Sequence, residues 1–239
     1  ETRRAEIPNF TGGEAAAITQ QGNPYIFRTS FTQTTAMPKV ANYIRDTLKS
    51  KSVDVIYVNN DFGKGGLDMI KKELEARGIK VPNSISTEPG QIDFTAAVLK
   101  TKQSGSDAVF VYSNEEESAR ALRELRKQGY NKPVIGETVL TSQKVIELAG
   151  DAANGAIAHV GLTADQAILT ALGNDVGFEL VFARQLMARA TAGDIAIAMS
   201  TSGNSADLTV ALREARHRGM YTIGFAGYDG GAFAASADV

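Results

Sequence analysis

One structural plan recurs along the chain, and this recurrence limits the fold more than any other feature. A short run of apolar or β-branched residues leads through a Gly, Asn or Ser turn into a segment with helical spacing; residues 53–58 (VDVIYV) and 107–113 (DAVFVYS) are two such runs. These runs are almost continuously apolar, which is typical of strands buried on both faces. Strands that alternate with helices of this length predict right-handed βαβ units and an α/β fold with doubly wound, flavodoxin-like or Rossmann-like parallel sheets.

The same plan continues to the end of the sequence. Further strands are predicted at residues 7–10, 79–86, 132–137, 155–162, 193–199 and 220–227. After the first run, apolar residues at Leu67, Ile70 and Leu74 mark one face of a helix. Residues 165–175 and 176–190 are predicted as two helices divided near Gly173.

Composition excludes several kinds of site and partner. The chain has no Cys, so disulfides, thiol nucleophiles and thiolate metal sites are excluded. It has only two His, whereas a catalytic zinc ion usually takes three His or carboxylate ligands, so we expect no zinc site. The net charge is -2 with both signs dispersed, so we expect no nucleic-acid partner. Apolar runs reach about six residues against the ~20 needed to cross a bilayer, so we expect no membrane span.

The stretch STSGNS has the composition of an anion-binding loop between a strand and a helix. Ser200, Thr201, Ser202 and Ser205 supply hydroxyl donors, and Gly203 lets the backbone approach a ligand. The helix that follows offers unpaired N–H groups and the positive end of its dipole. The alternative is that Asn204 or Ser205 only caps this helix. Four hydroxyls in six residues favour a phosphate site.

Three consecutive acids, Glu115 to Glu117, follow a predicted strand and open a helix. Negative charge at a helix N-terminus is stabilising, and we favour this structural role. The alternative is that some of these carboxylates face the ligand-binding edge of the sheet, outside the carboxyl ends of the strands.

Residues from about 7 to 163 resemble the type I periplasmic binding proteins for branched-chain amino acids. The resemblance rests on NPYIFRTSFTQTTAMPKVANYI, VIYVNNDFGKGG, GQIDFTAAVLKTKQSGSDAVFVYSN, GYNKPVIGETVL and AGDAANGAIAHVGLT. It implies two α/β lobes that close over an amino acid, this segment being similar to the second lobe. Glu137 would receive the ligand ammonium and Phe62 would pack on the ligand, with Ser113, Asn114 and His159 at neighbouring strand ends. The opposite wall of the cleft has no counterpart here, so we expect no tight amino-acid binding.

Residues from about 164 to 239 resemble the sugar-isomerase domain of sedoheptulose-7-phosphate (phosphoheptose) isomerases. The resemblance rests on ILTALGNDVGFELVFARQ, GDIAIAMSTSGNSADLTVALREARHRGM and TIGFAGYDGG. It implies sugar-phosphate binding at Ser200–Ser205, with Asn174 and Asp175 lining the sugar. The regions that carry the family's base Glu and acid His have no counterpart, and His217 lies about 18 Å along the helix from Ser205 at ~1.5 Å per residue. We therefore expect no catalysis and no cofactor.

Two resemblances in one chain predict a chimera of a periplasmic and a cytoplasmic family, which we interpret as engineered. The predicted parts are residues 1–29, a strand and crossing segment; residues 30–163, the binding-protein lobe; and residues 164–239, the isomerase-like fragment. In one arrangement the strands at 193–199 and 220–227 extend the first sheet. In the other, which we favour, they pair with the strand at 7–10 in a small second lobe.

Three functions follow from these observations. The first is a non-catalytic protein that binds a small anion or sugar phosphate weakly at Ser200–Ser205. The second is an amino-acid-binding module, and the third is a sedoheptulose-7-phosphate isomerase. The oligomeric state and the cellular location are not predicted.

Overall fold

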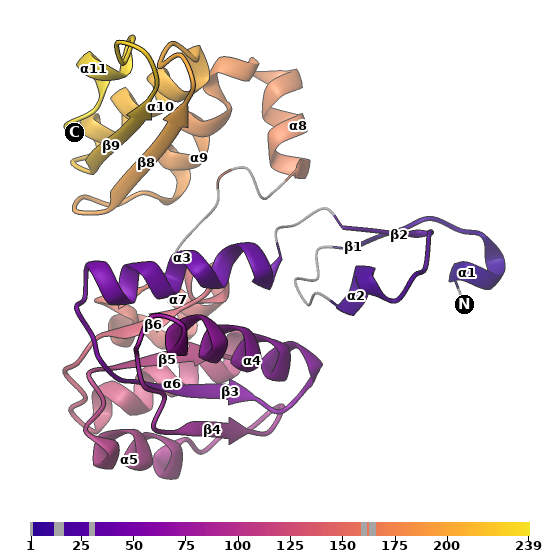
Figure 1. The fold of residues 1–239 in the computed structure, drawn as a ribbon, viewed down its shortest axis with the longest axis vertical. Helices are drawn as coiled ribbons and strands as arrows, with labels where there is room; N and C mark the ends of the chain where they lie inside the picture. The colour runs from indigo at the N-terminus through magenta and orange to yellow at the C-terminus, as the bar shows by residue number, and fades with distance from the viewer. Residues whose placement is uncertain (1, 12–16, 29–31, 159–161, 163–165) are drawn as a thin grey trace. The chain divides into compact units, whose positions relative to one another are not determined.

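The computed structural model describes residues 2–11, 17–28, 32–158, 162 and 166–239. The chain divides into two compact units, Glu1–Gly161 and Leu162–Val239, and each is described here by itself. Both units contain parallel strands and helices (Figure 1), so the predicted α/β class with parallel sheets is confirmed. The predicted part boundaries at residues 29 and 163 stay predictions.

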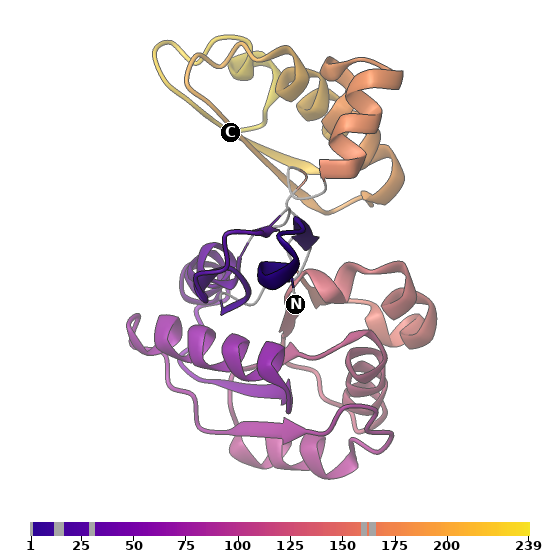
Figure 2. The same cartoon turned by 90° about the vertical axis from the view of Figure 1, so that its right-hand side faces the viewer.

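The first unit is built on a five-stranded parallel sheet in the order β4-β3-β5-β6-β7. Its strands are β3 (Val53–Val58), β4 (Ser84–Thr87), β5 (Ala108–Tyr112), β6 (Val134–Gly136) and β7 (Ala156–Ile157). Its helices are α3 (Gln33–Asp46), α4 (Asp61–Glu75), α5 (Thr95–Ser104), α6 (Glu115–Lys127) and α7 (Gln143–Ala149), with 3-10 turns at Thr138–Thr141 and Gly150–Ala153. The sheet is doubly wound, as predicted, because α3 and α4 pack on one face and α5, α6 and α7 on the other (Figures 1 and 2).

Side chains of β3 alternate between the two cores. Val53 and Val55 face the core of α3 and α4, whereas Ile56 faces the core of α5 and α6. All three are completely buried, which explains why this parallel strand has apolar residues on both of its faces. The predicted helical face of α4 is also present, since Ile70 and Leu74 are buried in the first of these cores.

The amino-terminal segment of this unit contains α1 (Thr2–Ala5), β1 (Asn9–Thr11), α2 (Ala17–Gln20) and β2 (Ile26–Arg28). β1 and β2 form a parallel pair of their own.

The second unit contains a two-stranded parallel sheet with helices packed against it. Its elements are α8 (Gln166–Asp175), a 3-10 turn at Phe178–Leu180, α9 (Val181–Arg189), β8 (Ile195–Ser200), α10 (Ala206–His217), β9 (Tyr221–Ala226) and α11 (Phe233–Ser236). A core of Val181, Phe182, Leu186, Ala215 and Met220 joins α9 and α10 to the sheet.

In the described sheets, β8 and β9 pair with each other. The amino-terminal strand, β1, pairs with β2. The predicted arrangement of the carboxy-terminal strands with respect to the first part of the chain stays a prediction.

Candidate functional site

The predicted anion loop lies where expected, between β8 and α10 in the second unit. β8 ends at Ser200 and α10 begins at Ala206, so Thr201–Ser205 connect the carboxyl end of a strand to a helix N-terminus. Gly203 is buried, and its φ of +67° places it in the left-handed region that favours glycine. A β-carbon at this position would lie 2.1 Å from the carbonyl oxygen of Gly230.

A second loop and the residues that follow it, 227–233, brace the first. The N–H of Gly227 donates to the carbonyl of Thr201 (3.0 Å), and the N–H of Phe233 donates to the carbonyl of Gly203 (3.1 Å). The Asn204 side chain accepts from the N–H of Ala232 (2.9 Å). The two loops therefore hold each other in one shape. This bracing was not predicted, although the glycine-rich sequence GYDGG was a signal for close backbone approach.

The hydroxyl groups of the loop bind one another and the loop backbone. Ser200 Oγ lies 3.0 Å from Ser205 Oγ and accepts a hydrogen bond from the N–H of Gly203 (3.2 Å). Ser202 Oγ accepts from the N–H of Asn204 (3.3 Å). The hydroxyl groups of Ser200, Ser202 and Ser205 are therefore engaged within the loop itself.

The alternative role of the loop, as a simple helix cap, is not observed. Ser205 occupies the N-cap position, but its side chain makes no capping hydrogen bond, and Asn204 is engaged with Ala232. Among the described residues, the N–H groups of Ala206 and Asp207 have no hydrogen-bond partner. The N-terminus of α10 is therefore open to a ligand. Asp207 in its first turn is the one acidic side chain there, and it opposes an anion.

The predicted sugar-lining residues lie at the end of α8 in the same unit. Asn174 and Asp175 are exposed, and the Asn174 amide donates to the Asp175 carboxylate (3.1 Å). Within the described part of the chain, no hydrogen bond joins either of them to residues 200–205.

In the first unit, two of the four predicted amino-acid-binding residues line a single cavity. This cavity of about 440 Å³ is bounded by Phe62, Asn114, Glu115, Glu116, Glu117, Val139 and Lys144. The Phe62 ring stacks on Tyr112 with centroids 4.4 Å apart, so it is held against the carboxyl end of β5. Asn114 occupies the N-cap position of α6.

The other two predicted residues, Ser113 and Glu137, are 1% and 2% exposed and do not line this cavity. They flank it in sequence, because Ser113 precedes Asn114 and Glu137 lies two residues before Val139. Thr138 Oγ1 donates to Glu137 Oε1 (2.5 Å). Among the described residues, Ser113 Oγ and Glu137 Oε2 have no hydrogen-bond partner. Buried polar atoms without partners are costly, and they are frequent where a ligand binds.

Sequence reasoning missed two members of the cavity wall, Val139 and Lys144, and left the role of the acidic triplet Glu115–Glu117 open. Lys144 on α7 was not predicted; its Nζ lies 3.0 Å from Glu116 Oε1. The hydrogen bond from Lys144 lowers the pKa of Glu116, and the same bond raises the pKa of Lys144. The acidic triplet has both roles that we considered, because it forms the first turn of α6 and also lines the cavity. No sequence pattern would have indicated Lys144.

Of the two His residues, the structure describes only His217, which lies at the far end of α10 from residues 200–205. His217 is exposed at the carboxyl end of α10, with Nδ1 4.0 Å from Glu214 Oε2. His159 lies outside the described residues. In the part of the chain that the structure describes, no group of three His, Cys, Asp or Glu is placed to hold a metal ion. None of the helices described has the length and apolar character that a bilayer crossing requires.

Two family models match the sequence. The model described as "Periplasmic binding protein" matches residues 2–177, and that described as "SIS domain" matches residues 138–227. Residues 138–177 are matched by both.

The curated relatives of this chain include several phosphoheptose isomerases. That of Bradyrhizobium sp. (strain BTAi1) is 53% identical over 75 residues, which are 31% of this chain and 38% of that relative. That of Geobacter sulfurreducens is 35% identical over 166 residues, or 69% of this chain and 78% of that relative. The chain thus spans well under half of the first relative's length.

Solved structures similar to this chain include amino-acid binding proteins. A leucine binding protein from Thermotoga maritima has a TM-score of 0.65 at 17% identity and covers 77% of this chain and 59% of its own. A branched-chain amino-acid ABC transporter protein from Thermus thermophilus with bound valine has a TM-score of 0.58 at 21% identity, covering 63% of this chain and 40% of its own. At these identities the likeness concerns the fold.

The expectation that the chain is not an enzyme is contradicted by these comparisons. Relatives of which this chain covers up to 78% are named phosphoheptose isomerases, and a SIS-domain model matches residues 138–227. Our reasoning relied on one family's positions for the base and the acid. Other carboxylates accompany the loop, including Asp207 in the first turn of α10 and Asp229 in the bracing loop.

Proposed function

Because the chain belongs to the periplasmic binding protein family over residues 2–177 and to the phosphoheptose isomerase family in its carboxy-terminal part, we propose that its second unit binds the phosphate group of a phosphorylated sugar at Ser200–Ser205. The observation that carries this proposal is the open N-terminus of α10. Its N-cap serine bonds to Ser200 rather than to the helix, so the first-turn N–H groups stay available. A helix N-terminus with free N–H groups favours a phosphate.

The shape of the loop supports the same ligand. Gly203 has a left-handed backbone and bonds to the second loop, so the donors are fixed before a ligand arrives. Preorganised donors lose little conformational entropy on binding. No Lys or Arg lies within residues 200–209, and Asp207 opposes an anion, so we expect free phosphate to bind weakly. The hydroxyl groups of the sugar would then supply the remaining affinity.

The activity that we propose for this site is the isomerisation for which the relatives are named. Interconversion of an aldose and a ketose moves a proton between two adjacent carbons, which needs a base and an acid near the bound sugar. The phosphate site would supply the positioning part of that reaction.

Thermal unfolding in phosphate, compared with chloride at matched ionic strength, tests the binding site. A dissociation constant near ~1 mM with ~10 mM ligand would stabilise the second unit by about 1.4 kcal/mol, or several degrees. Sulfate serves as a check on salting effects, and sedoheptulose 7-phosphate against sedoheptulose isolates the phosphate group. A saturable rise with the phosphorylated sugar supports the proposal, and equal melting in all of these solutions contradicts it. Turnover of sedoheptulose 7-phosphate tests the activity separately.

A second candidate function is favoured by the two buried polar atoms of the first unit. Glu137 Oε2 and Ser113 Oγ lack partners, and each residue lies within two positions in the sequence of a residue that lines the cavity of Phe62. An ammonium group would satisfy the Glu137 carboxylate, and Phe62 would pack on an apolar side chain. The unit would thus bind a small amino acid, the class named for the two solved structures described above. With one wall of the cleft we expect weak binding.

Calorimetric titration with leucine or valine tests this second function. Glu137→Gln should weaken binding by about tenfold or more, because the charge that meets the ammonium is removed. Glu147→Gln, an exposed carboxylate on α7, is the matched control and should bind as the unaltered chain does. Equal affinity of the Glu137→Gln variant and the unaltered chain would contradict the assignment.

We also infer that the union of the two families in this chain is engineered. In support, the two matches overlap over residues 138–177, a range that includes α7 and α8, whereas natural fusions usually join whole domains through exposed linkers. Discovery of one natural gene that encodes the whole sequence would overturn this inference.

A further inference from the structure

The β8–β9 sheet carries elements of its unit on one side only. Figures 1 and 2 show the helices of the second unit packed on one side of the two strands. Among the described residues of this unit, no helix or strand covers the other side. A parallel sheet is normally covered on both faces, because its strands carry apolar side chains on both faces.

The two sides of this sheet differ in side-chain size. The inner side carries small residues: Ala196 packs into the core of α9 and α10, and Ala198 packs against Leu212 and Phe233. The outer side carries large apolar residues, and the parallel register places them opposite one another across the two strands. The pairs are Ile195 with Tyr221, Ile197 with Ile223, and Met199 with Phe225. We call these six residues the outer face.

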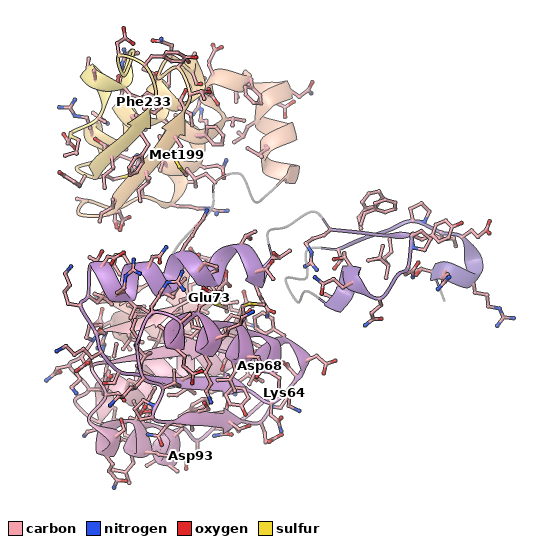
Figure 3. All side chains as sticks on the ribbon, in the orientation of Figure 1. Lys64, Asp68, Glu73, Asp93, Met199 and Phe233 are labelled. Atoms are coloured by element: carbon pink, nitrogen blue, oxygen red, sulfur yellow. The ribbon has the colours of Figure 1, made fainter. Side chains whose placement is uncertain are left out.

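The outer face is exposed to an unusual degree for such side chains. Five of its six members are between 49% and 67% exposed, and Met199, labelled in Figure 3, is the most exposed of them. At ~100 Å² of exposed surface for each, they offer about 500 Å² of apolar area. A patch of this size is at the upper end of what monomeric proteins expose, and such patches commonly mark interaction sites.

The chemistry of the outer face identifies its partner. Neither β8 nor β9 contains a charged residue, so the face offers nothing to a phosphate backbone or to a charged peptide. A neutral, flat, apolar surface is complementary to a copy of itself, and a two-fold axis would bring the same six residues of each copy together. A stable interface takes ~800 Å² from each partner, of which these side chains would supply more than half.

We propose that two copies of this chain associate through their outer faces, with the β8–β9 sheets packed against each other. Face-to-face sheets lie ~10 Å apart, a distance that interdigitated Ile, Met and Phe side chains fill. Ile197 and Ile223 form the central pair and would lie near the two-fold axis. Association would give these parallel strands the second covering layer that they lack within the unit.

Sedimentation equilibrium over a wide range of protein concentration tests the proposal. The unaltered chain should approach the mass of two chains as concentration rises. Ile197→Lys should weaken self-association by about tenfold or more, because it buries an unpaired charge at the centre of the interface. Leu99→Lys is the matched control: Leu99 is 47% exposed on α5 of the other unit, and its replacement should leave association unchanged.

Mixing two variants makes the test specific for a symmetric face. Ile197→Lys and Ile197→Glu should each associate more weakly than the unaltered chain, and an equimolar mixture should recover association, because the opposite charges meet across the axis. Circular dichroism of each variant checks that the fold is retained. Monomeric unaltered chain at every concentration, equal association of Ile197→Lys and Leu99→Lys, or a mixture that associates no more strongly than either variant alone would each overturn the proposal.

Discussion

Replacement of Gly203 by Ala should destabilise the second unit by about 3 kcal/mol. Part of the cost comes from the backbone, since a left-handed φ of +67° costs a residue with a β-carbon ~1 kcal/mol or slightly more. The larger part is steric. The new β-carbon would lie 2.1 Å from the Gly230 carbonyl oxygen, whereas ordinary contact begins at 3.4 Å. Overpacking of this kind costs ~1–3 kcal/mol, and here the obstacle is backbone, which cannot rotate away.

Urea unfolding followed by circular dichroism measures this cost. Gly105→Ala is the matched control, because Gly105 has a φ of +72° and its β-carbon would meet nothing within 4 Å. This control should lose ~1 kcal/mol from the backbone term alone. The Gly203→Ala variant should also lose its stabilisation by phosphate, because the Gly230 carbonyl must move away and open the loop. Equal losses of stability in the two variants would show that the loops do not brace each other and would refute the reasoning.

Two further predictions concern a helix terminus and the Asp238 carboxylate. Ser205→Ala should lower the free energy of unfolding by less than ~0.5 kcal/mol in a thermal melt, because Ser205 does not cap α10. Asn60→Ala should lower it by ~1 kcal/mol, because the Asn60 side chain accepts from the N–H of Gly63 (2.8 Å). Equal losses in the two variants would mean that Ser205 does cap its helix. Hydrogen bonds from the Thr222 hydroxyl and N–H lower the pKa of Asp238. The stability that Asp238 contributes is therefore present above its unfolded pKa and is lost as pH falls through the lower folded pKa, below about pH 4. In melts at several pH values, Asp238→Asn should lose less stability below about pH 4 than the unaltered chain does. An equal loss in the two proteins would contradict the assignment.

Much of the first unit could be predicted from the sequence, because burial on both faces leaves a local pattern. The runs at 53–58 and 107–113 became β3 (Val53–Val58) and β5 (Ala108–Tyr112) within a residue or two. The run at 79–86 was less accurate, and its strand begins at Ser84, two residues after Pro82, which cannot donate to a strand ladder.

Features that depend on distant contacts could not be predicted in this way. The pairing of β1 with β2 and the bracing of residues 200–205 by residues 227–233 join segments whose sequences do not show which partner each will contact. The exposure of Ile197 and Met199 is a similar case. Their apolar run predicts a covered strand, and only the structure reveals that one side has no covering element within the described unit.

The candidate sites show the same division between local and tertiary information. Composition pointed to residues 200–205, which do connect a strand to a helix, and the role of this loop in phosphate binding stays a prediction. Phe62 and Asn114 line one cavity, as expected of residues at the shared edge of parallel strands, and their role in amino-acid binding stays a prediction. Lys144 was missed because it reaches Glu116 from α7, and nothing in its neighbouring sequence distinguishes it from a solvent-facing lysine.

An NMR titration of the amide groups with phosphate, at constant ionic strength against chloride, tests the proposed phosphate site most directly. We predict that the N–H signals of Gly203, Ala206 and Asp207 shift with one common, saturable midpoint, while that of Gly105 at the end of α5 stays in place. Sedoheptulose 7-phosphate should move the same signals at lower concentration than phosphate does. If the signals of these three residues remain fixed while the unit is folded, residues 200–205 do not bind phosphate and the proposed function is wrong.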